Sequence, residues 1–225
     1  MSEHSKKIYR SILERTARNL EANNMKCFIV ESKEEVLPIV KELLTEGETV
    51  SCGGSMTLAE TGVAELLRSG AYNFLDRAGK SPEEAELIYR QAFSADSYLT
   101  SSNAITENGE LYNVDGNSNR VAAICYGPKS VIIVAGRNKV VPTLDDAVMR
   151  VKRLAAPMNT ERLNCETYCK SKGECMSLAS GCTGCSGMTS GCKSDARICC
   201  SFVVSAFQRI RHRIKVILVN EELGF

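Results

Sequence analysis

The sequence predicts an α/β domain in which a mostly parallel sheet is flanked by helices. Short apolar runs alternate with amphipathic, helix-spaced patterns over about the first 155 residues, and this alternation is typical of strand–helix–strand units. The run VIIVA at 131–135 has no polar position, as expected of a strand that is buried on both faces of a sheet. A second apolar run, IKVILV at 214–219, predicts a strand that returns to the same sheet.

The first part of the chain contains three helix patterns and two strand patterns. Ile8, Ile12 and Leu20 recur at helical spacing. The second strand pattern leads directly into Gly53-Gly54, where a tight turn is expected. The expected helices are 5–24, 33–44 and 57–67, and the expected strands are 27–30 and 48–52.

The middle of the chain carries clear local signals. Ser81 with Glu84 three residues later is a capping-box pattern, which predicts a helix over 82–93. The Asn108-Gly109 pair predicts a hairpin over 104–113. The other expected elements are a strand at 96–100, a helix over 143–154 and a helix over 202–210.

Charge and hydropathy exclude two classes of partner. Lys and Arg total 28 against 27 Asp and Glu, so the formal net charge is +1. A protein that neutralises many phosphates needs a basic excess, so nucleic acid is not an expected partner. No apolar run approaches the roughly 20 residues of a membrane-spanning helix, and the N-terminal residues lack the apolar stretch of a secretory signal. We therefore expect a cytoplasmic protein without membrane insertion.

Cysteine is distributed unevenly along the chain. Eight of the 11 cysteines lie between Cys165 and Cys200. This stretch has few large aliphatic residues, so it needs crosslinks or a bound metal to be ordered. Because the apolar run at 214–219 follows it, we expect one domain over 1–225 with a cysteine-rich insertion at about 165–200.

This insertion is expected to bind metal. In a chain without a secretory signal, metal or redox chemistry is favoured over structural disulfides. Four thiolates complete either an iron–sulfur cluster or a zinc site; the cluster is the first expectation and zinc is the alternative. Cys182 and Cys185 form a CxxC pair, whereas the adjacent Cys199 and Cys200 are unsuited to share one metal. A set of reduced thiols with a structural disulfide is the competing interpretation.

Two polar loops are candidates for a ligand pocket. The first contains Gly53, Gly54 and Ser55, where backbone N–H groups at a helix start suit a phosphate or carboxylate. A simple strand-to-helix turn would use the same residues. The candidate ligand residues of the second loop are Asn103, Asp115, Gly116, Asn119 and Arg120. Open α/β sheets place their sites at the carboxyl ends of strands, so we expect the loops to lie within about 10 Å of each other. The competing interpretation is that the second loop only braces the hairpin.

Glu107 and Asp115 are the candidate catalytic groups. A carboxylate can act as a base or contact a ligand hydroxyl or ribose. Glu60 is a further candidate, although a position one turn into a helix is more often solvated. His4 and His212 lie in places that do not support a Ser–His pair, so hydrolysis of that type is disfavoured.

Three segments resemble the lactate-utilisation (LUD) domain family. They are SCGGSMTLAETGV at 51–63, the stretch 101–141 that includes ENGELYNVDGNSNR, and RIKVILVNEELGF at 213–225. The resemblance covers nearly the whole chain. It implies an α/β fold similar to that of the glucosamine-phosphate isomerase, ribose-phosphate isomerase and CoA-transferase group. Members are linked to lactate utilisation or have no known activity, and lactate-utilisation proteins are thought to act beside partner subunits.

The resemblance also implies metal ligands. Small bacterial members usually carry a Cys-x5-Cys-x2-Cys-x6-Cys motif before the final strand. The cysteines that match this motif here are Cys169, Cys175, Cys192 and Cys199. Residues 176–191 replace the short spacer and add Cys182 and Cys185, which are the main alternative ligands.

The residues and the resemblance together favour one function and leave two alternatives. The favoured function is a lactate-utilisation-type protein that binds a small anionic metabolite or nucleotide-like ligand. Such a protein would carry a cysteine-ligated metal or iron–sulfur site, serve redox metabolism, and work with a partner subunit or as a homo-oligomer. One alternative is a transferase or isomerase that acts on an activated acid or phosphosugar; the other is a non-catalytic metal-binding interaction module. The sequence does not decide whether the chain is an enzyme, but oxidoreductase-associated chemistry is favoured over group transfer.

Overall fold

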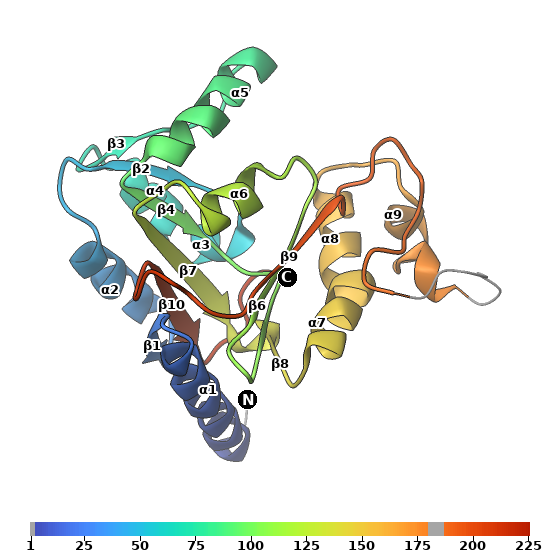
Figure 1. Cartoon of the computed structure of the whole chain (residues 1–225), viewed down its shortest axis with the longest axis horizontal. Coiled ribbons are helices and arrows are strands. Elements are labelled where there is room, and N and C mark those ends of the chain that lie inside the picture. The colour runs from blue at the N-terminus through green and yellow to red at the C-terminus, as the bar shows by residue number, and fades with distance from the viewer. Residues whose placement is uncertain (1–2, 180–186) are drawn as a thin grey trace.

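Two sheets organise the chain. The computed structural model describes residues 3–179 and 187–225 (Figure 1). The larger sheet has six strands in the order β1-β10-β7-β4-β2-β3, and every neighbouring pair is parallel. Its strands are β1 (Lys26–Val30), β2 (Thr49–Cys52), β3 (Asn73–Phe74), β4 (Ser97–Thr100), β7 (Ser130–Gly136) and β10 (Ile214–Val219). The predicted fold class, an α/β domain with a mostly parallel sheet, is confirmed.

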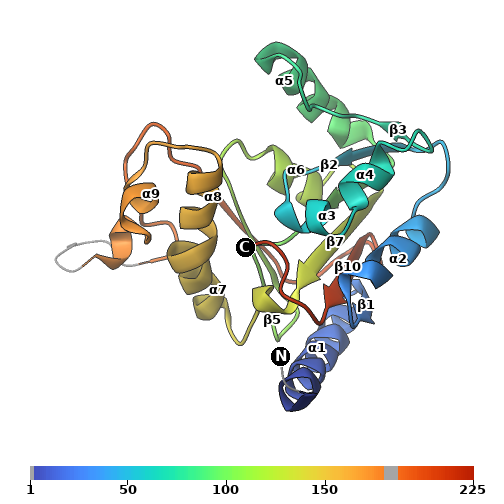
Figure 2. The ribbon, with the colours of Figure 1, turned by 180° about the vertical axis from the view of Figure 1, so that it is seen from behind.

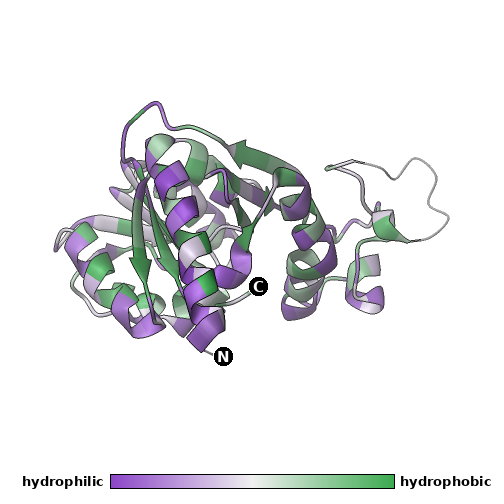
Figure 3. Ribbon diagram, turned by 90° about the horizontal axis from the view of Figure 1, so that it is seen from below, coloured by the Kyte–Doolittle hydropathy of each residue, from purple (hydrophilic) through white to green (hydrophobic). Residues whose placement is uncertain are grey.

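The two apolar runs of the sequence form the centre of this sheet. Strand β10 lies between β1 and β7, with Ile214 opposite Val131 in the register. Alternate residues of β7 face opposite sides of the sheet. Ile132 and Val134 pack in one core cluster, whereas Val131 and Ile133 pack in another. In Figure 3 the strands are green along most of their length, while the helices alternate between green and purple.

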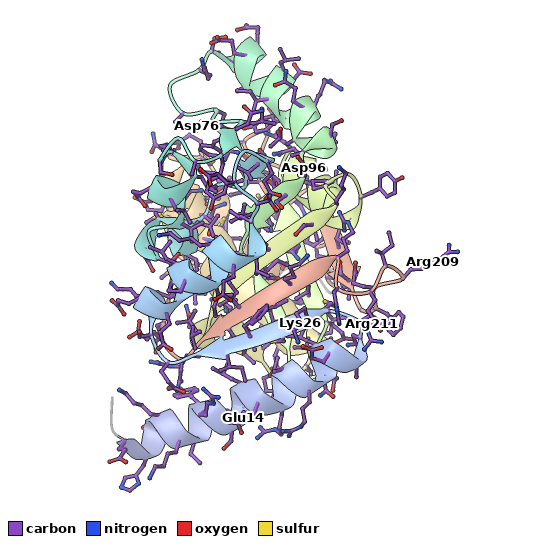
Figure 4. All side chains as sticks on the ribbon, turned by 90° about the vertical axis from the view of Figure 1, so that its left-hand side faces the viewer. Glu14, Lys26, Asp76, Asp96, Arg209 and Arg211 are labelled. Atoms are coloured by element: carbon purple, nitrogen blue, oxygen red, sulfur yellow. The ribbon has the colours of Figure 1, made fainter. Side chains whose placement is uncertain are left out.

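Different helices cover the two faces. Helices α2 (Val36–Leu43), α3 (Met56–Glu60) and α4 (Val63–Leu67) contribute to the cluster with Ile132 and Val134 (Figure 2). Helices α1 (Glu3–Ala22) and α6 (Asn119–Cys125) contribute to the cluster with Val131 and Ile133. Figure 4 looks at the β1 edge, where α1 runs alongside β1 and the strands β10 and β7 follow. The short helices η1 (Lys33–Glu35) and η2 (Ala92–Ser94) flank α2 and β4.

Several local predictions are confirmed in detail. Helix α5 (Pro82–Gln91) begins after Ser81, whose hydroxyl accepts from the Glu84 N–H while the Glu84 carboxylate accepts from the Ser81 N–H. The hairpin consists of β5 (Ala104–Thr106) and β6 (Leu111–Asp115), paired antiparallel. The helix expected over 57–67 is divided into α3 and α4 at Gly62, which has a φ of 72°.

The smaller sheet contradicts one prediction. Its order is β8-β5-β6-β9, with β8 at Val140–Val141 and β9 at Ser201–Ser205. The prediction of a helix over 202–210 is therefore wrong. The first part of that range is strand β9, which pairs antiparallel with β6. Phe202, Val203 and Val204 are β-branched or aromatic and suit a strand once an open edge is available to pair with. That edge is supplied by a segment about 90 residues earlier in the chain.

A long helical segment covers the smaller sheet. It runs from α7 (Leu144–Arg150) through the π-helical turn η4 (Val151–Ala155) into α8 (Ala156–Arg162). It extends the helix expected over 143–154, and Ala147 and Val151 pack against Tyr112 of β6. The cysteine-rich segment follows, with α9 (Tyr168–Lys172) and η5 (Met176–Leu178) (Figure 1). No helix among residues 3–179 and 187–225 is long and apolar enough to cross a membrane.

Gly109 is expected to be intolerant of a side chain. Its φ is 81°, and a Cβ there would lie 2.7 Å from the backbone of Asn19 and Leu20 in α1. Gly79 has a similar φ of 71° but has nothing within 4 Å of such a Cβ. We expect Gly109→Ala to lower the free energy of unfolding by about 3 kcal/mol or more, and Gly79→Ala by about 1 kcal/mol. Urea denaturation measures both, and equal losses would contradict the close packing of the hairpin on α1.

Candidate functional site

A cleft of about 310 Å³ opens where several strands end. It is bordered by the segments that follow β2, β4 and β7 of the larger sheet and β6 of the smaller one, together with α8. These elements meet in the middle of Figure 1. The cleft therefore lies at the carboxyl ends of parallel strands, the usual place for a site in an open α/β sheet.

The two loops singled out in the sequence both border this cleft. The predicted ligand residues that line it are Gly53, Gly54, Ser55, Asn103, Asp115, Gly116, Asn119 and Arg120. A Cβ on Gly53 would lie 3.1 Å from Cδ of Arg120, so the loops are in contact. Helices α3 and α6, which begin at these loops, have only five and seven residues. Side-chain charge, and not a helix dipole, thus dominates the electrostatics of the cleft.

Arg120 is fixed by four hydrogen bonds to neutral oxygen atoms. Its Nη1 donates to Ser101 O at 3.2 Å and to Asn113 Oδ1 at 2.6 Å. Its Nη2 donates to Asn103 Oδ1 at 2.8 Å and to Val114 O at 2.7 Å. Burial lowers the pKa of Arg120. The guanidinium is therefore rigidly placed at the cleft, and no carboxylate accepts a hydrogen bond from it in the described part of the chain.

Asp115 caps the start of α6. Its Oδ2 accepts from the backbone N–H groups of Arg120 at 2.9 Å and Val121 at 3.1 Å. Among the described residues that line the cleft, Asp115 is also the only Asp or Glu. Because the carboxylate already holds two amides, its first role in the structure is to fix this loop.

Lys139 also lines the cleft and was not singled out from the sequence. It ends the turn η3 (Arg137–Lys139) after β7 and is only 3 % exposed. Its Nζ lies 2.9 Å from Thr57 Oγ1 and 3.0 Å from Ser101 Oγ. Burial, and then the positive charges of Arg150 and Arg120, lower its pKa to about 7. Its position in the short polar turn that follows the apolar strand run 131–135 was the signal that could have identified it.

Arg77 and Arg162 complete the set of basic residues in the cleft. Arg77 donates to Cys52 O at 2.9 Å and lies 5.3 Å from the Tyr89 ring centroid. Arg162 donates to Asn159 Oδ1 from Nε and Nη2. Its pKa is lowered by burial and then by the positive charge of Arg77. Two like charges thus repel each other across the opening of the cleft.

None of the four basic side chains of the cleft forms an ion pair within the described ranges. The salt bridges among residues 3–179 and 187–225 involve other groups. Four basic side chains and one acidic side chain from the described residues therefore share a partly buried space. Such a space has a positive potential that a bound anion would neutralise.

The other two carboxylate candidates lie elsewhere. Glu107 sits in the turn of the hairpin, and its Oε2 accepts from Arg15 Nη2 at 2.9 Å. It does not line the cleft. The Glu60 carboxylate accepts from the Gly224 N–H at 2.8 Å and is likewise outside the lining. Asp115 is therefore the sole predicted carboxylate that the fold brings to the cleft.

A second, smaller cavity lies in the cysteine-rich segment. Its volume is about 20 Å³, and four of the predicted metal ligands line it: Cys169, Cys175, Cys192 and Cys199. Their neighbours include the apolar side chains of Val151, Met188 and Phe202. Cys182 and Cys185 lie outside the described residues. In the described ranges, no three His, Cys, Asp or Glu side chains come together closely enough to hold a metal ion.

The donor set around this cavity nevertheless fits a thiolate-bound metal. The four cysteines come from two stretches of chain, 169–175 and 192–199, and border one space. Hydroxyl groups of Thr160 and Thr167 lie 3.5 and 3.4 Å from Cys169 Sγ. Arg197 Nε donates to Cys199 Sγ at 3.2 Å. Burial raises the pKa of the Cys199 thiol, while Arg197 opposes that rise. The Arg197 N–H and the Thr167 hydroxyl, which can donate to Cys169 Sγ, are of the kind that orient and stabilise metal-binding sulfur, whereas the Thr160 hydroxyl donates to Pro157 O.

Comparison with known proteins agrees with the fold. The family profile described as LUD domain matches residues 13–219. This chain is an α/β protein of the LUD class, and it belongs to the LUD domain family, as the sequence segments indicated. A DUF162 family protein from Deinococcus radiodurans has a similar structure, with a TM-score of 0.52, 16% identity, and coverage of 94% of this chain and 98% of that chain. The delta subunit of eIF2B from Chaetomium thermophilum matches with a TM-score of 0.34 and 18% identity, over 52% of this chain and 50% of that chain. No curated protein matches the chain.

Proposed function

We propose that this LUD-domain protein binds a small anionic metabolite or nucleotide-like ligand in the cleft between its polar loops. The observation that supports this most strongly is the convergence of four basic side chains that lack ion-pair partners in the described ranges. Arg77 and Arg162 offer guanidinium groups, which match carboxylate and phosphate geometry. Arg120, whose four Nη hydrogens go to protein oxygens, contributes its positive charge. Each charge-assisted hydrogen bond to such a ligand is worth about 1.5–3 kcal/mol.

The pocket also offers neutral recognition groups. Asn103 and Asn119 line it, and Thr100, Ser101 and Ser102 add hydroxyl groups. Such groups suit the hydroxyls of a sugar or hydroxy acid. The combination favours a ligand that carries an anionic group and several oxygen atoms over a purely apolar ligand.

We further propose that the cysteine-rich segment holds a metal, with an iron–sulfur cluster ahead of zinc, and that the protein serves redox metabolism of the lactate-utilisation type. Cys169, Cys175, Cys192 and Cys199 would be the ligands. Thiolate ligation would supply either electron transfer, for a cluster, or structural order, for zinc. The support is the shared cavity that these four cysteines line.

The transferase or isomerase alternative is less well supported. Such chemistry by a carboxylate needs a base or nucleophile that faces the ligand. Glu107 lies in the hairpin turn, and the Asp115 carboxylate holds two backbone amides. The non-catalytic alternative would leave the basic cleft without a role.

A panel of anions tests the binding proposal. We expect inorganic phosphate, citrate or AMP at about 100 times its Kd to stabilise the folded state by about 2.7 kcal/mol, which raises Tm by about 5 °C for a chain of this size. Glycerol and adenosine, which lack the charge, should give no comparable shift. Differential scanning fluorimetry at matched ionic strength makes the measurement. If potassium chloride raised Tm as much as every anion of the panel, specific binding would be refuted.

A further inference from the structure

We infer that Lys139 is a nucleophile: its ε-amine forms an imine with the carbonyl carbon of a small anionic oxo compound bound in the cleft. This inference rests on the proposed anion binding and adds a reacting group and a substrate class to it. Nothing in the sequence patterns had marked Lys139 as a site residue.

The surroundings of the Lys139 amine are unusual for a buried lysine. A buried ammonium is ordinarily paired with a carboxylate, because an unpaired charge is costly to bury. Here the hydrogen-bond partners of Nζ are two hydroxyls, Thr57 Oγ1 on α3 and Ser101 Oγ after β4. The nearest positive charges, Arg150 and Arg120, lower the pKa of the amine, and the Glu60 carboxylate offsets this only in part. This environment favours the uncharged amine, which is the nucleophilic form.

The hydrogen-bond directions orient the amine. Thr57 Oγ1 donates its proton to Leu223 O at 3.2 Å, so it accepts an N–H from Lys139. Ser101 Oγ accepts the second N–H of the uncharged amine and donates its own proton to Ser102 O at 3.5 Å, a long contact that leaves this proton able to transfer during the reaction. The amine is thus held between one fixed acceptor and one hydroxyl that lines the cleft. A pKa of about 7 leaves about half of the amine uncharged at neutral pH.

The proposed step balances without an oxidant or a reductant. The Lys139 lone pair forms the C–N bond while the carbonyl π bond breaks, and the oxygen takes a proton to give a carbinolamine. The Ser101 hydroxyl can relay this proton from the attacking nitrogen. The carbinolamine hydroxyl then takes a second proton from solvent and leaves as water while the nitrogen lone pair forms the C=N π bond, which gives the protonated imine. The anionic group of the substrate would lie against the guanidinium groups of the cleft.

Pyridoxal 5′-phosphate is a suitable probe, because it is an anionic aldehyde whose imine absorbs visible light and is fixed by borohydride. We expect peptide mass spectrometry after reduction at pH 7.5 to locate the label on Lys139, at a rate about tenfold or more above that of the other lysines. The rate should rise with pH through about 7, since the uncharged amine reacts. Ser101→Ala should lower the rate of labelling, and the label should still be found on Lys139.

Two lysine variants provide a matched comparison. Lys215 is half-buried with a lowered pKa and donates to Ser130 Oγ at 2.9 Å, but it does not line the cleft. Lys139→Arg should abolish the fast label, and Lys215→Arg should retain it. The site of labelling in the wild-type protein is decisive even if a variant fails to fold. Label spread evenly over surface lysines would overturn the inference.

Two further measurements distinguish imine formation by Lys139 from anion binding in the cleft. Pyridoxal lacks the phosphate, so it should label Lys139 at least tenfold more slowly than its phosphate. If pyridoxal and pyridoxal 5′-phosphate label Lys139 equally fast, imine formation by Lys139 is supported and the anion-binding subsite is refuted. If inorganic phosphate stabilises the protein but no aldehyde labels Lys139, anion binding is supported and imine formation by Lys139 is refuted.

Discussion

Replacement of Arg120 by lysine is expected to destabilise the protein by about 3–5 kcal/mol, although it preserves the charge. Four oxygen atoms, on Ser101, Asn103, Asn113 and Val114, accept hydrogen bonds from the guanidinium. A lysine ammonium has three donors at a single point and cannot reach all four acceptors. Each buried acceptor left unpaired costs about 1–3 kcal/mol. Chemical denaturation of Arg120→Lys measures the loss.

A matched control separates this effect from a general effect of arginine replacement. Arg90 lies on the exposed surface of α5 and pairs with Glu86 four residues earlier. Arg90→Lys should change the free energy of unfolding by less than about 0.5 kcal/mol. An Arg120→Lys protein as stable as Arg90→Lys would show that Arg120 does not hold the segments after β4 and at the end of β6 in place. The same variant should also lose affinity for anions, because the loops supply most of the cleft lining.

Anaerobically purified wild-type protein is expected to contain at least about one metal equivalent per chain. Replacement of Cys192 by serine should remove this metal. Cys192 lines the same cavity as Cys169, Cys175 and Cys199. A serine hydroxyl is a poor ligand for the soft metals that thiolates prefer. Quantification of iron, sulfide and zinc measures the content, and visible absorption distinguishes a cluster from zinc.

Cys27 provides the control for this substitution. It lies on β1, where burial raises the pKa of its thiol to about 12. It does not border the cysteine cavity, so Cys27→Ser should keep its metal. Less than about 0.2 metal per chain in the wild-type protein would contradict the metal proposal. Equal metal content in the Cys192 and Cys27 variants would contradict the choice of ligands.

Local signals predicted the elements that depend on neighbouring residues. The capping box of Ser81 and Glu84 marked the start of α5, and the Asn108-Gly109 pair marked the hairpin turn. The apolar runs marked the central strands because burial on both faces leaves no position for a polar residue. Strand β9 was missed because its partner, β6, is distant in the sequence, and the choice between helix and strand was settled by that tertiary pairing.

The residues of the cleft likewise divide into those that a local sequence pattern predicted and those that only the tertiary fold brings together. The glycine loop and Arg120 were predicted because each lies in a polar loop beside a strand end. Glu107 was placed with them because it is near Asn103 in sequence, but the hairpin carries its turn away from the cleft and onto α1. Arg77, Lys139 and Arg162 come from three separate segments. Their convergence depends on the tertiary fold, and no local pattern marks it.

The most direct test of the central claim is a comparison of anion affinity between two double variants. Arg77→Gln with Arg162→Gln removes the two mutually repelling guanidinium groups of the cleft. Arg90→Gln with Arg209→Gln removes two exposed arginines that do not line it. Titration calorimetry with inorganic phosphate and citrate at constant ionic strength measures the affinity of each protein. We predict saturable binding of one anion by the wild-type and control proteins, and affinity at least about tenfold lower in the cleft variant, equal to about 1.4 kcal/mol. Equal affinity in all three proteins would contradict an anion site in this cleft.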